Sequence, residues 1–195
     1  MTTSLFLATR NRHKTSEIQT ILGSSVIVTD ATQVPGLPEV EETGKTFEAN
    51  ARLKAEAISD YVGGFVLADD SGLEVDALGG EPGIYSARYA GPNSTDLRNT
   101  ELVLEKMKGV AFEQRTARFR CVLALAQGCV TVAVFDGSVE GLLTTEISGE
   151  GGFGYDPIFM PLGYDKTFGE LPPELKNSMS HRARALAALQ LFKFE

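Results

Sequence analysis

Residues 66–91 read VLADDSGLEVDALGGEPGIYSARYAG, and this stretch organises the interpretation of the whole chain. An apolar run at 65–68 predicts a buried strand. Asp69 and Asp70 end the run, and adjacent carboxylates at a strand end can hold a hard cation such as magnesium, which takes oxygen ligands and few of them from protein. Asp-Ser-Gly is also ordinary turn chemistry, and taken alone the tetrapeptide 69–72 favours a plain turn.

The residues after this tetrapeptide are unusual for a loop. Apolar and acidic residues alternate from 73 to 77, which predicts a second strand with one apolar and one acidic face. GGEPG at 79–83 then bends the chain, and residues 84–91 bring aromatic side chains beside Arg88. Carboxylates, glycines, aromatics and a cation thus stand close together in the sequence, which favours a functional site.

Composition limits the class of protein. With 195 residues, 43% hydrophobic and 23% charged, the chain predicts a globular protein with a single domain over 1–195. No apolar run reaches the roughly 18 residues of a membrane span, and the first residues lack the basic region of a signal peptide, so we expect a cytoplasmic protein without a membrane partner. The net charge of −8 argues against a nucleic-acid partner, because duplex binding needs a basic surface.

Cysteine and histidine usage bears on metals. Cys121 and Cys129 lie in apolar surroundings and form no CxxC pair, so we expect both to be reduced core residues of a cytosolic protein. His13 and His181 are the only histidines, which rules out a three-histidine zinc site and the HExxH pattern. An oxygen-ligated divalent ion is the better expectation.

The N-terminal segment predicts a strand at 5–8, a polar loop, and a helix whose apolar residues recur at helical spacing until Gly23. A helix N-terminus with free N–H groups and nearby cations attracts phosphate. A solvated basic first turn explains the loop equally well, and the lack of GxGxxG disfavours a dinucleotide fold. The candidate phosphate ligands here are Thr9, Arg10, Asn11, Arg12, His13 and Lys14.

A helix from 46 to about 61 contains an inward-facing lysine. At 100° per residue Lys54 falls in the apolar stripe of Phe47, with Asn50 one turn before it. A buried lysine is costly unless it meets an anion, although it can also snorkel to solvent. GKT at 44–46 resembles the end of a Walker A motif, but Glu39 stands where that motif needs glycine, so we do not expect a P-loop.

Two C-terminal segments supply candidate base-binding residues. In EGGFGYDP at 150–157 the glycines permit close backbone approach, and an aromatic ring there can stack on a base, although the loop is also explicable as turn chemistry. A closing helix begins near Ser180, and cations gather at its N-terminus. The candidates are Phe153, Gly154, Tyr155, Asp156, Lys176, His181 and Arg182. Strands at 116–126 and 130–139 should pair as a hairpin.

DDSGLEVDALGGEPGIYSARYAG at 69–91 closely resembles the signature of the inosine/xanthosine triphosphate pyrophosphatases, the Ham1-like family that removes non-standard purine nucleotides. Four further motifs match that family in order: Thr9, Asn11 and Lys14; ETG at 42–44 with Phe47, Asn50, Ala51 and Lys54; FGYDP at 153–157; and Lys176 with SHR at 180–182. The chain departs from the pattern at Arg10, where many members have glycine, and at Ala49, where glutamate is frequent.

The resemblance implies an α/β fold with an elongated, mixed, curved sheet flanked by helices, and two lobes with the ligand in a central cleft. It implies a homodimer that hydrolyses ITP, dITP and XTP to the monophosphate and pyrophosphate with Mg²⁺, which cleanses the nucleotide pool. A non-catalytic purine-nucleotide-binding sensor is the alternative. Removal of a γ-phosphate by a kinase or phosphohydrolase is disfavoured by the broken Walker pattern.

Residue roles follow from the same resemblance. Asp70 is expected to be metal ligand and proton acceptor, Glu42 the second metal ligand, and Asp69 a weaker candidate that ties the turn. The loop 9–14, Lys54 and Ser71 are expected to hold the phosphates, and the base-binding candidates named above to grip the purine. A donor facing the 6-oxo group would oppose the amino group of adenine and so reject ATP.

Overall fold

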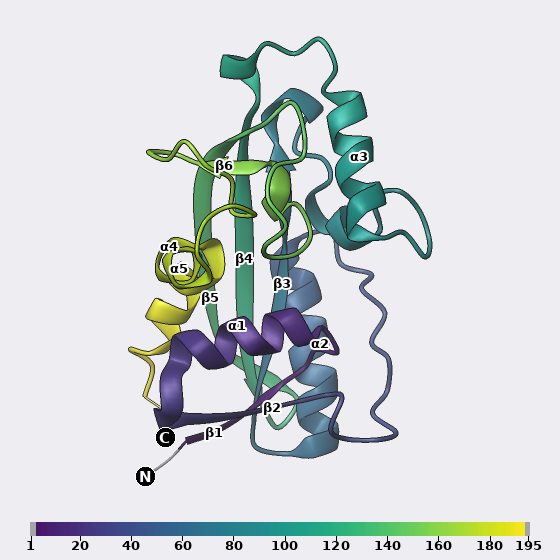
Figure 1. Cartoon of the computed structure of the whole chain (residues 1–195). Helices are drawn as coiled ribbons and strands as arrows, with labels where there is room; N and C mark the ends of the chain where they lie inside the picture. Colours follow the sequence, from purple (N-terminus) through teal and green to yellow (C-terminus); the bar gives the residue numbers. More distant parts are fainter. Residues whose placement is uncertain (1–2, 194–195) are drawn as a thin grey trace. The chain divides into compact units, whose positions relative to one another are not determined.

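The computed structural model describes residues 3–193, which form a mixed α/β fold with one six-stranded sheet and flanking helices (Figure 1). The expected fold class is therefore confirmed. In chain order the strands and α-helices are β1 (Thr3–Leu7), α1 (Arg12–Leu22), β2 (Val26–Asp30), α2 (Phe47–Val62), β3 (Phe65–Val75), α3 (Asp96–Lys106), β4 (Thr116–Gln127), β5 (Val130–Leu143), β6 (Phe159–Pro161), α4 (Pro173–Met179) and α5 (His181–Leu189).

The sheet has the order β2-β1-β3-β4-β5-β6. β1 pairs in parallel with β2 and with β3, whereas β5 and β6 are antiparallel. Gly128 and Cys129 join β4 to β5 with φ values of 57° and 67°, the left-handed backbone that a tight hairpin turn requires. The predicted hairpin is confirmed, with β4 ending at Gln127 and β5 beginning at Val130.

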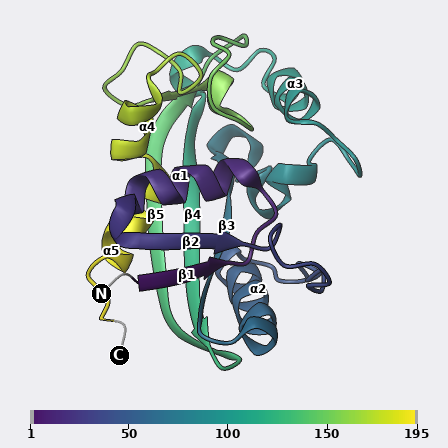
Figure 2. The ribbon, with the colours of Figure 1, turned by 60° about the horizontal axis from the view of Figure 1, so that its bottom comes forward.

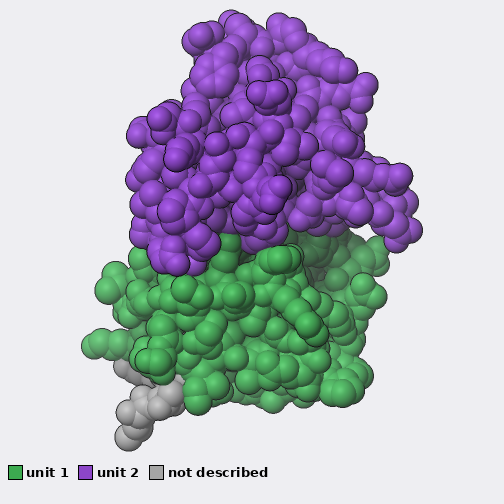
Figure 3. All heavy atoms as spheres, viewed as in Figure 1, with its two compact units in different colours: residues 1–70, 121–137, 182–195 green, residues 71–120, 138–181 purple. Residues whose placement is uncertain are grey.

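The chain divides into two units, coloured separately in Figure 3. Each unit has its own hydrophobic core. Unit 1 comprises residues 1–70, 121–137 and 182–195, and unit 2 comprises residues 71–120 and 138–181. Two units agree with the two lobes that the family resemblance implies. A single domain and a ligand cleft stay predictions.

In unit 1, helices cover both faces of the strands. α1 and α5 share one core cluster with β1, β3 and β4, and its fully buried members include Leu5, Ile18 and Leu186. α2 lies on the opposite face of β1 and β2 from α1 (Figure 2), where Ala51 and Ala55 are completely buried. A side chain of β3 therefore meets α1 and α5 or α2, depending on the face it occupies.

Unit 2 is centred on aromatic packing. The Phe159 ring lies 4.6 Å from that of Phe119 and 5.3 Å from that of Phe168, between ring centroids. Val103 and Met107 at the end of α3 are completely buried in the same cluster. Close, offset ring contacts of this kind add to the stability that apolar burial provides.

β3 corrects the expected position of the turn. Residues 69–72 do not form a turn between two strands, because β3 runs unbroken from Phe65 to Val75. Gly72 serves close packing instead, because a Cβ there would lie 2.3 Å from Ser86 Oγ and 2.5 Å from the Gly83 carbonyl oxygen. Successive side chains of a strand point to opposite faces, so Asp69 and Asp70 face different partners.

The two cysteines differ in environment. Cys121 is fully buried in β4, as expected, but Cys129 is exposed in the hairpin turn, so the expectation of two core cysteines is wrong for Cys129. Its neighbours Val130 and Val132 are apolar yet exposed, and hydropathy along the chain did not reveal this. Among residues 3–193, no helix is long and apolar enough to cross a membrane.

Candidate active site

Asp70 faces α2 and meets a lysine that bridges two carboxylates. Lys54 Nζ lies 3.0 Å from Asp70 Oδ1 and 2.6 Å from Glu42 Oε1. It also donates to the Asp69 carbonyl oxygen at 3.0 Å. The expectation that Lys54 faces inward from α2 is confirmed, and the anion that repays its burial is this pair of carboxylates.

Burial dominates the electrostatics of this cluster. It raises the pKa of the Asp70 carboxyl, an effect that the Lys54 charge offsets only in part. The same burial would lower the pKa of Lys54, but the charges of Asp70 and Glu42 outweigh it and the pKa rises. Asp70 Oδ2 is buried and has no hydrogen-bond partner among the described residues. One carboxylate oxygen of Asp70 is thus available for a ligand. Because two carboxylates share one ammonium here, a further positive charge would be favourable.

The donor set fits a hard divalent cation. Among residues 3–193 no group of three or more His, Cys, Asp or Glu side chains is arranged to hold a metal ion. Glu42 and Asp70 do share the ammonium of Lys54, so their carboxylates converge on one point. Magnesium commonly binds through one or two carboxylates and completes its shell with water and substrate phosphate oxygens. Two convergent carboxylates with a buried, unpartnered oxygen satisfy that requirement.

Asp69 occupies the opposite face of β3 and binds cations from α1 and α5. Its Oδ1 lies 2.5 Å from Lys14 Nζ, and its Oδ2 lies 2.7 Å from Arg182 Nε and 3.3 Å from Cys121 Sγ. Arg182 also pairs with Glu17 of α1. Burial would raise the pKa of Asp69, but Arg182 and Lys14 hold it well below the usual range. Asp69 therefore anchors two helices to the strand that carries Asp70.

The N-terminal loop forms the strand–loop–helix arrangement expected of a phosphate site. Asn11 caps α1, because its Oδ1 accepts from the backbone N–H groups of His13 and Lys14. Thr9 Oγ1 accepts from the Asn11 N–H at 3.1 Å. Two of the helix's first N–H groups are thus already engaged, whereas the side chains of residues 10–13 are exposed.

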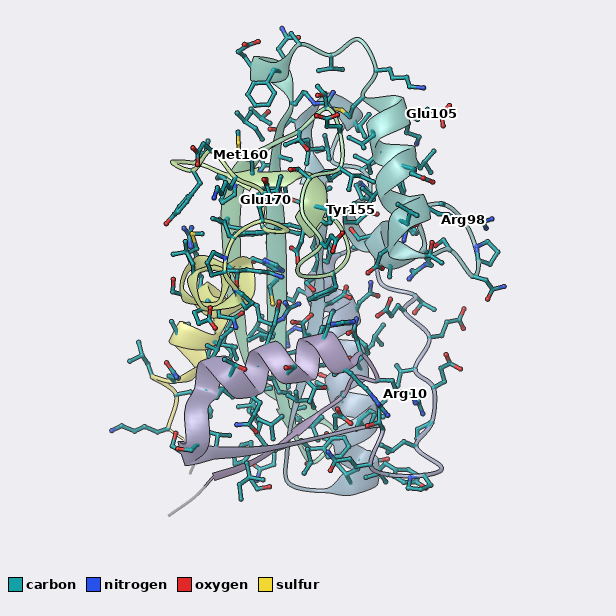
Figure 4. The ribbon with its side chains drawn as sticks, in the orientation of Figure 1. Arg10, Arg98, Glu105, Tyr155, Met160 and Glu170 are labelled. Carbon is teal, nitrogen blue, oxygen red and sulfur yellow. The ribbon has the colours of Figure 1, made fainter. Side chains whose placement is uncertain are left out.

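Arg10, labelled in Figure 4, has a defined partner as well. Its Nη2 donates to the Leu37 carbonyl oxygen at 2.8 Å. Leu37 belongs to the segment 31–46, which contains Glu42 and forms neither helix nor strand. The residue that departs from the family pattern therefore contacts the loop of a candidate metal ligand.

In unit 2 the glycine-rich loop meets α4. Lys176 pairs with Asp156, and its ammonium lies 4.8 Å from the centre of the Phe153 ring. Asp156 Oδ2 also accepts from the Phe153 N–H at 2.8 Å. Tyr155, labelled in Figure 4, is buried, and its hydroxyl donates to the Ser86 carbonyl at 2.8 Å.

His181 is buried and stacks on Phe119, with ring centroids 4.9 Å apart at an interplanar angle of 15°. The neighbouring residue Arg182 belongs to unit 1 and is 1% exposed, with its guanidinium between Asp69 and Glu17. These two residues, adjacent in sequence, therefore have separate partners.

The predicted site residues fall into two sets. Unit 1 holds Thr9, Arg10, Asn11, Arg12, His13, Lys14, Glu42, Lys54, Asp70 and Arg182, and unit 2 holds Ser71, Phe153, Gly154, Tyr155, Asp156, Lys176 and His181. Sequence reasoning missed Glu17 and Phe119. Glu17 follows Lys14 by three residues on a helix, a spacing that places both on one face and could have indicated its role. Phe119 gave no such signal.

Fold and site together define the class of protein. It is a mixed α/β protein in which one strand carries paired acids and cations on both faces, an arrangement suited to binding phosphorylated ligands. The chain belongs to the Ham1 family, whose pattern matches residues 5–192. It is 49% identical to the dITP/XTP pyrophosphatase of Halalkalibacterium halodurans over 184 residues, covering 94% of this chain and 95% of the relative.

Solved structures agree with this membership. The Ham1 protein of Staphylococcus aureus is 43% identical and superposes with a TM-score of 0.85, over 96% of each chain. The nucleoside-triphosphatase/dITP/XTP pyrophosphatase of Mycobacterium abscessus is 42% identical with a TM-score of 0.77, over 97% of this chain and 100% of that one. Similarity at this level extends across both units.

Proposed function

We propose that the chain hydrolyses non-standard purine nucleoside triphosphates, dITP, ITP and XTP, to the monophosphate and pyrophosphate. The observation that carries the proposal is the Asp70 carboxylate: it is buried, ion-paired to Lys54 through one oxygen and unpartnered among the described residues at the other. The relatives named as dITP/XTP pyrophosphatases support the choice of substrate.

Asp70 acts as the proton acceptor. A water oxygen bonds to the α-phosphorus while the bond from that phosphorus to the bridging oxygen breaks, and pyrophosphate leaves with that oxygen. The proton of the attacking water passes to the Asp70 carboxylate. Burial raises the pKa of this carboxyl, which brings a carboxylate closer to the basicity that proton transfer near neutral pH requires.

Asp70 and Glu42 are also the residues that would hold Mg²⁺. When bound there, Mg²⁺ would neutralise charge on the triphosphate and lower the pKa of a water. The chain's own part is to hold both carboxylates close together, and Lys54 does this through its contacts of 3.0 Å with Asp70 and 2.6 Å with Glu42.

The remaining side chains bind two different parts of the substrate, the phosphates and the purine. The loop of Thr9, Arg10, Asn11, Arg12, His13 and Lys14, together with Lys54 and Ser71, binds the phosphates. Phe153, Gly154, Tyr155, Asp156, Lys176, His181 and Arg182 recognise the purine. A cationic or N–H donor at the 6-oxo group disfavours adenine, whose amino group offers no acceptor there.

The test is product identification with dITP, ITP, XTP and ATP in the presence of Mg²⁺. We expect pyrophosphate and the monophosphate from the first three, and ATP turnover slower by roughly 10²-fold or more. Asp70→Asn should lower kcat by about 10²- to 10⁴-fold while the fold is kept. Asp165→Asn, at an exposed position, is the matched control.

Other products would point elsewhere. Orthophosphate and a diphosphate would indicate attack at the γ-phosphorus and refute the proposal. Saturable binding of dITP without any product would support the non-catalytic sensor instead. No contact among the described residues favours that alternative.

A homodimer, which the family resemblance implies, and a cytoplasmic location, which the N-terminal sequence and the cysteine usage indicate, belong to the same proposal. Light scattering of the purified protein tests the dimer, for which we expect twice the mass of the chain.

A further inference from the structure

The segment 31–46, which carries Glu42, has no regular secondary structure of its own. A loop of that kind is mobile unless side chains from elsewhere hold it. Glu42 is proposed as a metal ligand, and a ligand must be held within a fraction of an ångström of its productive position. The residues that hold the segment therefore matter for the site.

Asn50 holds this segment close to Glu42. It lies in the first turn of α2 and is completely buried. Its Oδ1 accepts from the Gly44 N–H at 2.8 Å, two residues after Glu42. One turn further along α2, Lys54 binds the Glu42 carboxylate itself. Two side chains of α2 thus hold the loop: Asn50 binds its backbone at Gly44, and Lys54 binds the side chain of Glu42.

Gly44 shows how close this contact is. A Cβ at Gly44 would lie 2.6 Å from Asn50 Oδ1 and 2.7 Å from Ala49 Cβ, so only glycine lets the loop approach the helix here. The φ of Gly44 is not in the left-handed region, so its need for glycine comes from this approach and not from its backbone conformation.

The amide nitrogen of Asn50 adds a second observation. Nδ2 is buried and has no hydrogen-bond partner among the described residues, although a buried donor ordinarily has one. A residue needed only to fill space at this point of α2 would be better apolar. The asparagine supplies the acceptor that the Gly44 N–H needs, which an apolar side chain could not do.

We propose that Asn50 is a positioning residue that sets the affinity of the site for its divalent cation by holding the Glu42 loop at Gly44. The inference rests on the proposed function. Loss of a partner that orients a metal ligand typically weakens metal affinity or activity 10- to 100-fold. We therefore expect Asn50→Leu to raise the Mg²⁺ concentration for half-maximal activity by roughly 10-fold or more, with a smaller change in kcat at saturating Mg²⁺.

Asn99 is a matched control. It is also a buried asparagine in the first turn of a helix, α3, and its Oδ1 accepts from a backbone N–H, that of Ala90, at 2.8 Å. Its Nδ2 also donates to the Ala87 carbonyl oxygen at 3.2 Å, so Asn99→Leu should reduce thermal stability at least as much as Asn50→Leu but leave the Mg²⁺ midpoint unchanged. A purely structural role for Asn50 predicts the same behaviour for both variants.

Gly44→Ala provides an independent variant that keeps Asn50. The added methyl should push the loop away from Asn50 and Ala49, and because residue 44 lies in a partly exposed loop we expect the fold to be retained, which circular dichroism checks. Binding of Mn²⁺, followed by its electron paramagnetic resonance signal in the presence of a dITP analogue with a non-hydrolysable α,β bridge, reads metal affinity without turnover. We expect weaker Mn²⁺ binding for Gly44→Ala and for Asn50→Leu.

An unchanged Mg²⁺ midpoint and unchanged Mn²⁺ binding in folded Gly44→Ala would overturn the inference. So would an equal shift in Asn99→Leu. A wild-type protein that produces no pyrophosphate from dITP at any Mg²⁺ concentration would instead overturn the proposed function, so the two failures are distinguishable.

Discussion

Replacing Lys54 by methionine removes the cation that contacts both Glu42 and Asp70. The side chains of Lys54, Asp70 and Glu42 are 13%, 9% and 25% exposed, so solvent screens the ion pairs only weakly. At 3.0 Å and an effective dielectric constant near 20, one such pair is worth about 5 kcal/mol before the cost of burying the amine is subtracted. Methionine keeps the length and helix propensity of lysine, so the main change is in charge.

We expect Lys54→Met to lower the free energy of unfolding by about 3 kcal/mol in EDTA at pH 7, the usual cost of leaving one member of a buried pair uncompensated. The charges of Asp70 and Glu42 raise the pKa of Lys54 above that of an ordinary lysine, so at pH 7 its stabilising contribution is fully present in the wild type. Mg²⁺ should restore part of the loss, because a cation on Asp70 and Glu42 replaces the missing charge. Mg²⁺ therefore stabilises the variant more than the wild type.

Urea unfolding followed by far-ultraviolet circular dichroism measures this, since the chain has no tryptophan. Arg52→Met is the control on the same helix: Arg52 pairs with Glu48 in solvent, with side chains 42% and 51% exposed, and should lose less than about 0.5 kcal/mol without any response to Mg²⁺. Equal stabilisation of wild type and Lys54→Met by Mg²⁺, or a loss below about 1 kcal/mol in EDTA, would refute the argument.

Two further predictions concern the residues around this cluster. Asp69→Asn should lower the free energy of unfolding by about 3 to 5 kcal/mol at pH 7. Because Arg182 and Lys14 depress the pKa of Asp69, the wild type loses this advantage as the pH falls from the ordinary pKa of an aspartate toward the depressed one, and the difference between the two unfolding free energies in EDTA should narrow at acid pH. A difference that stays constant with pH would contradict the assignment. Arg10→Gly removes the contact with the Leu37 carbonyl and should lower the free energy of unfolding by about 1 kcal/mol. In steady-state kinetics it should raise the KM for dITP and largely keep kcat. An unchanged KM would exclude Arg10 from phosphate binding.

Much of the site could be predicted from local sequence. Periodicity alone placed Lys54 on the inward face of its helix, and the cost of burying an amine indicated an anion nearby. The polar loop before the first helix was also predictable, because capping residues such as Asn11 act on the N–H groups two and three residues ahead.

The prediction that Asp69 and Asp70 lie together at a turn is wrong, and the structure shows why. Asp-Ser-Gly is typical of turns, but in this chain Gly72 is required by the approach of Ser86, which lies beyond the bend at 79–83. Turn propensity is a local property, whereas a close approach depends on a segment that returns from elsewhere. The strand accordingly continues, and the two aspartates face different helices.

The sequence by itself determined the family, the mixed α/β class and the types of residue that could do the chemistry, since motifs and periodicities are encoded over short spans. Only the tertiary structure decided which charges each of the two acids meets. Asp69 is neutralised by Lys14 and by Arg182, which is 113 residues away in sequence, while Asp70 keeps a buried oxygen without a partner among the described residues. The physical reason is strand alternation: it sends neighbouring carboxylates to opposite faces, and the helices packed there set the charge that each one meets.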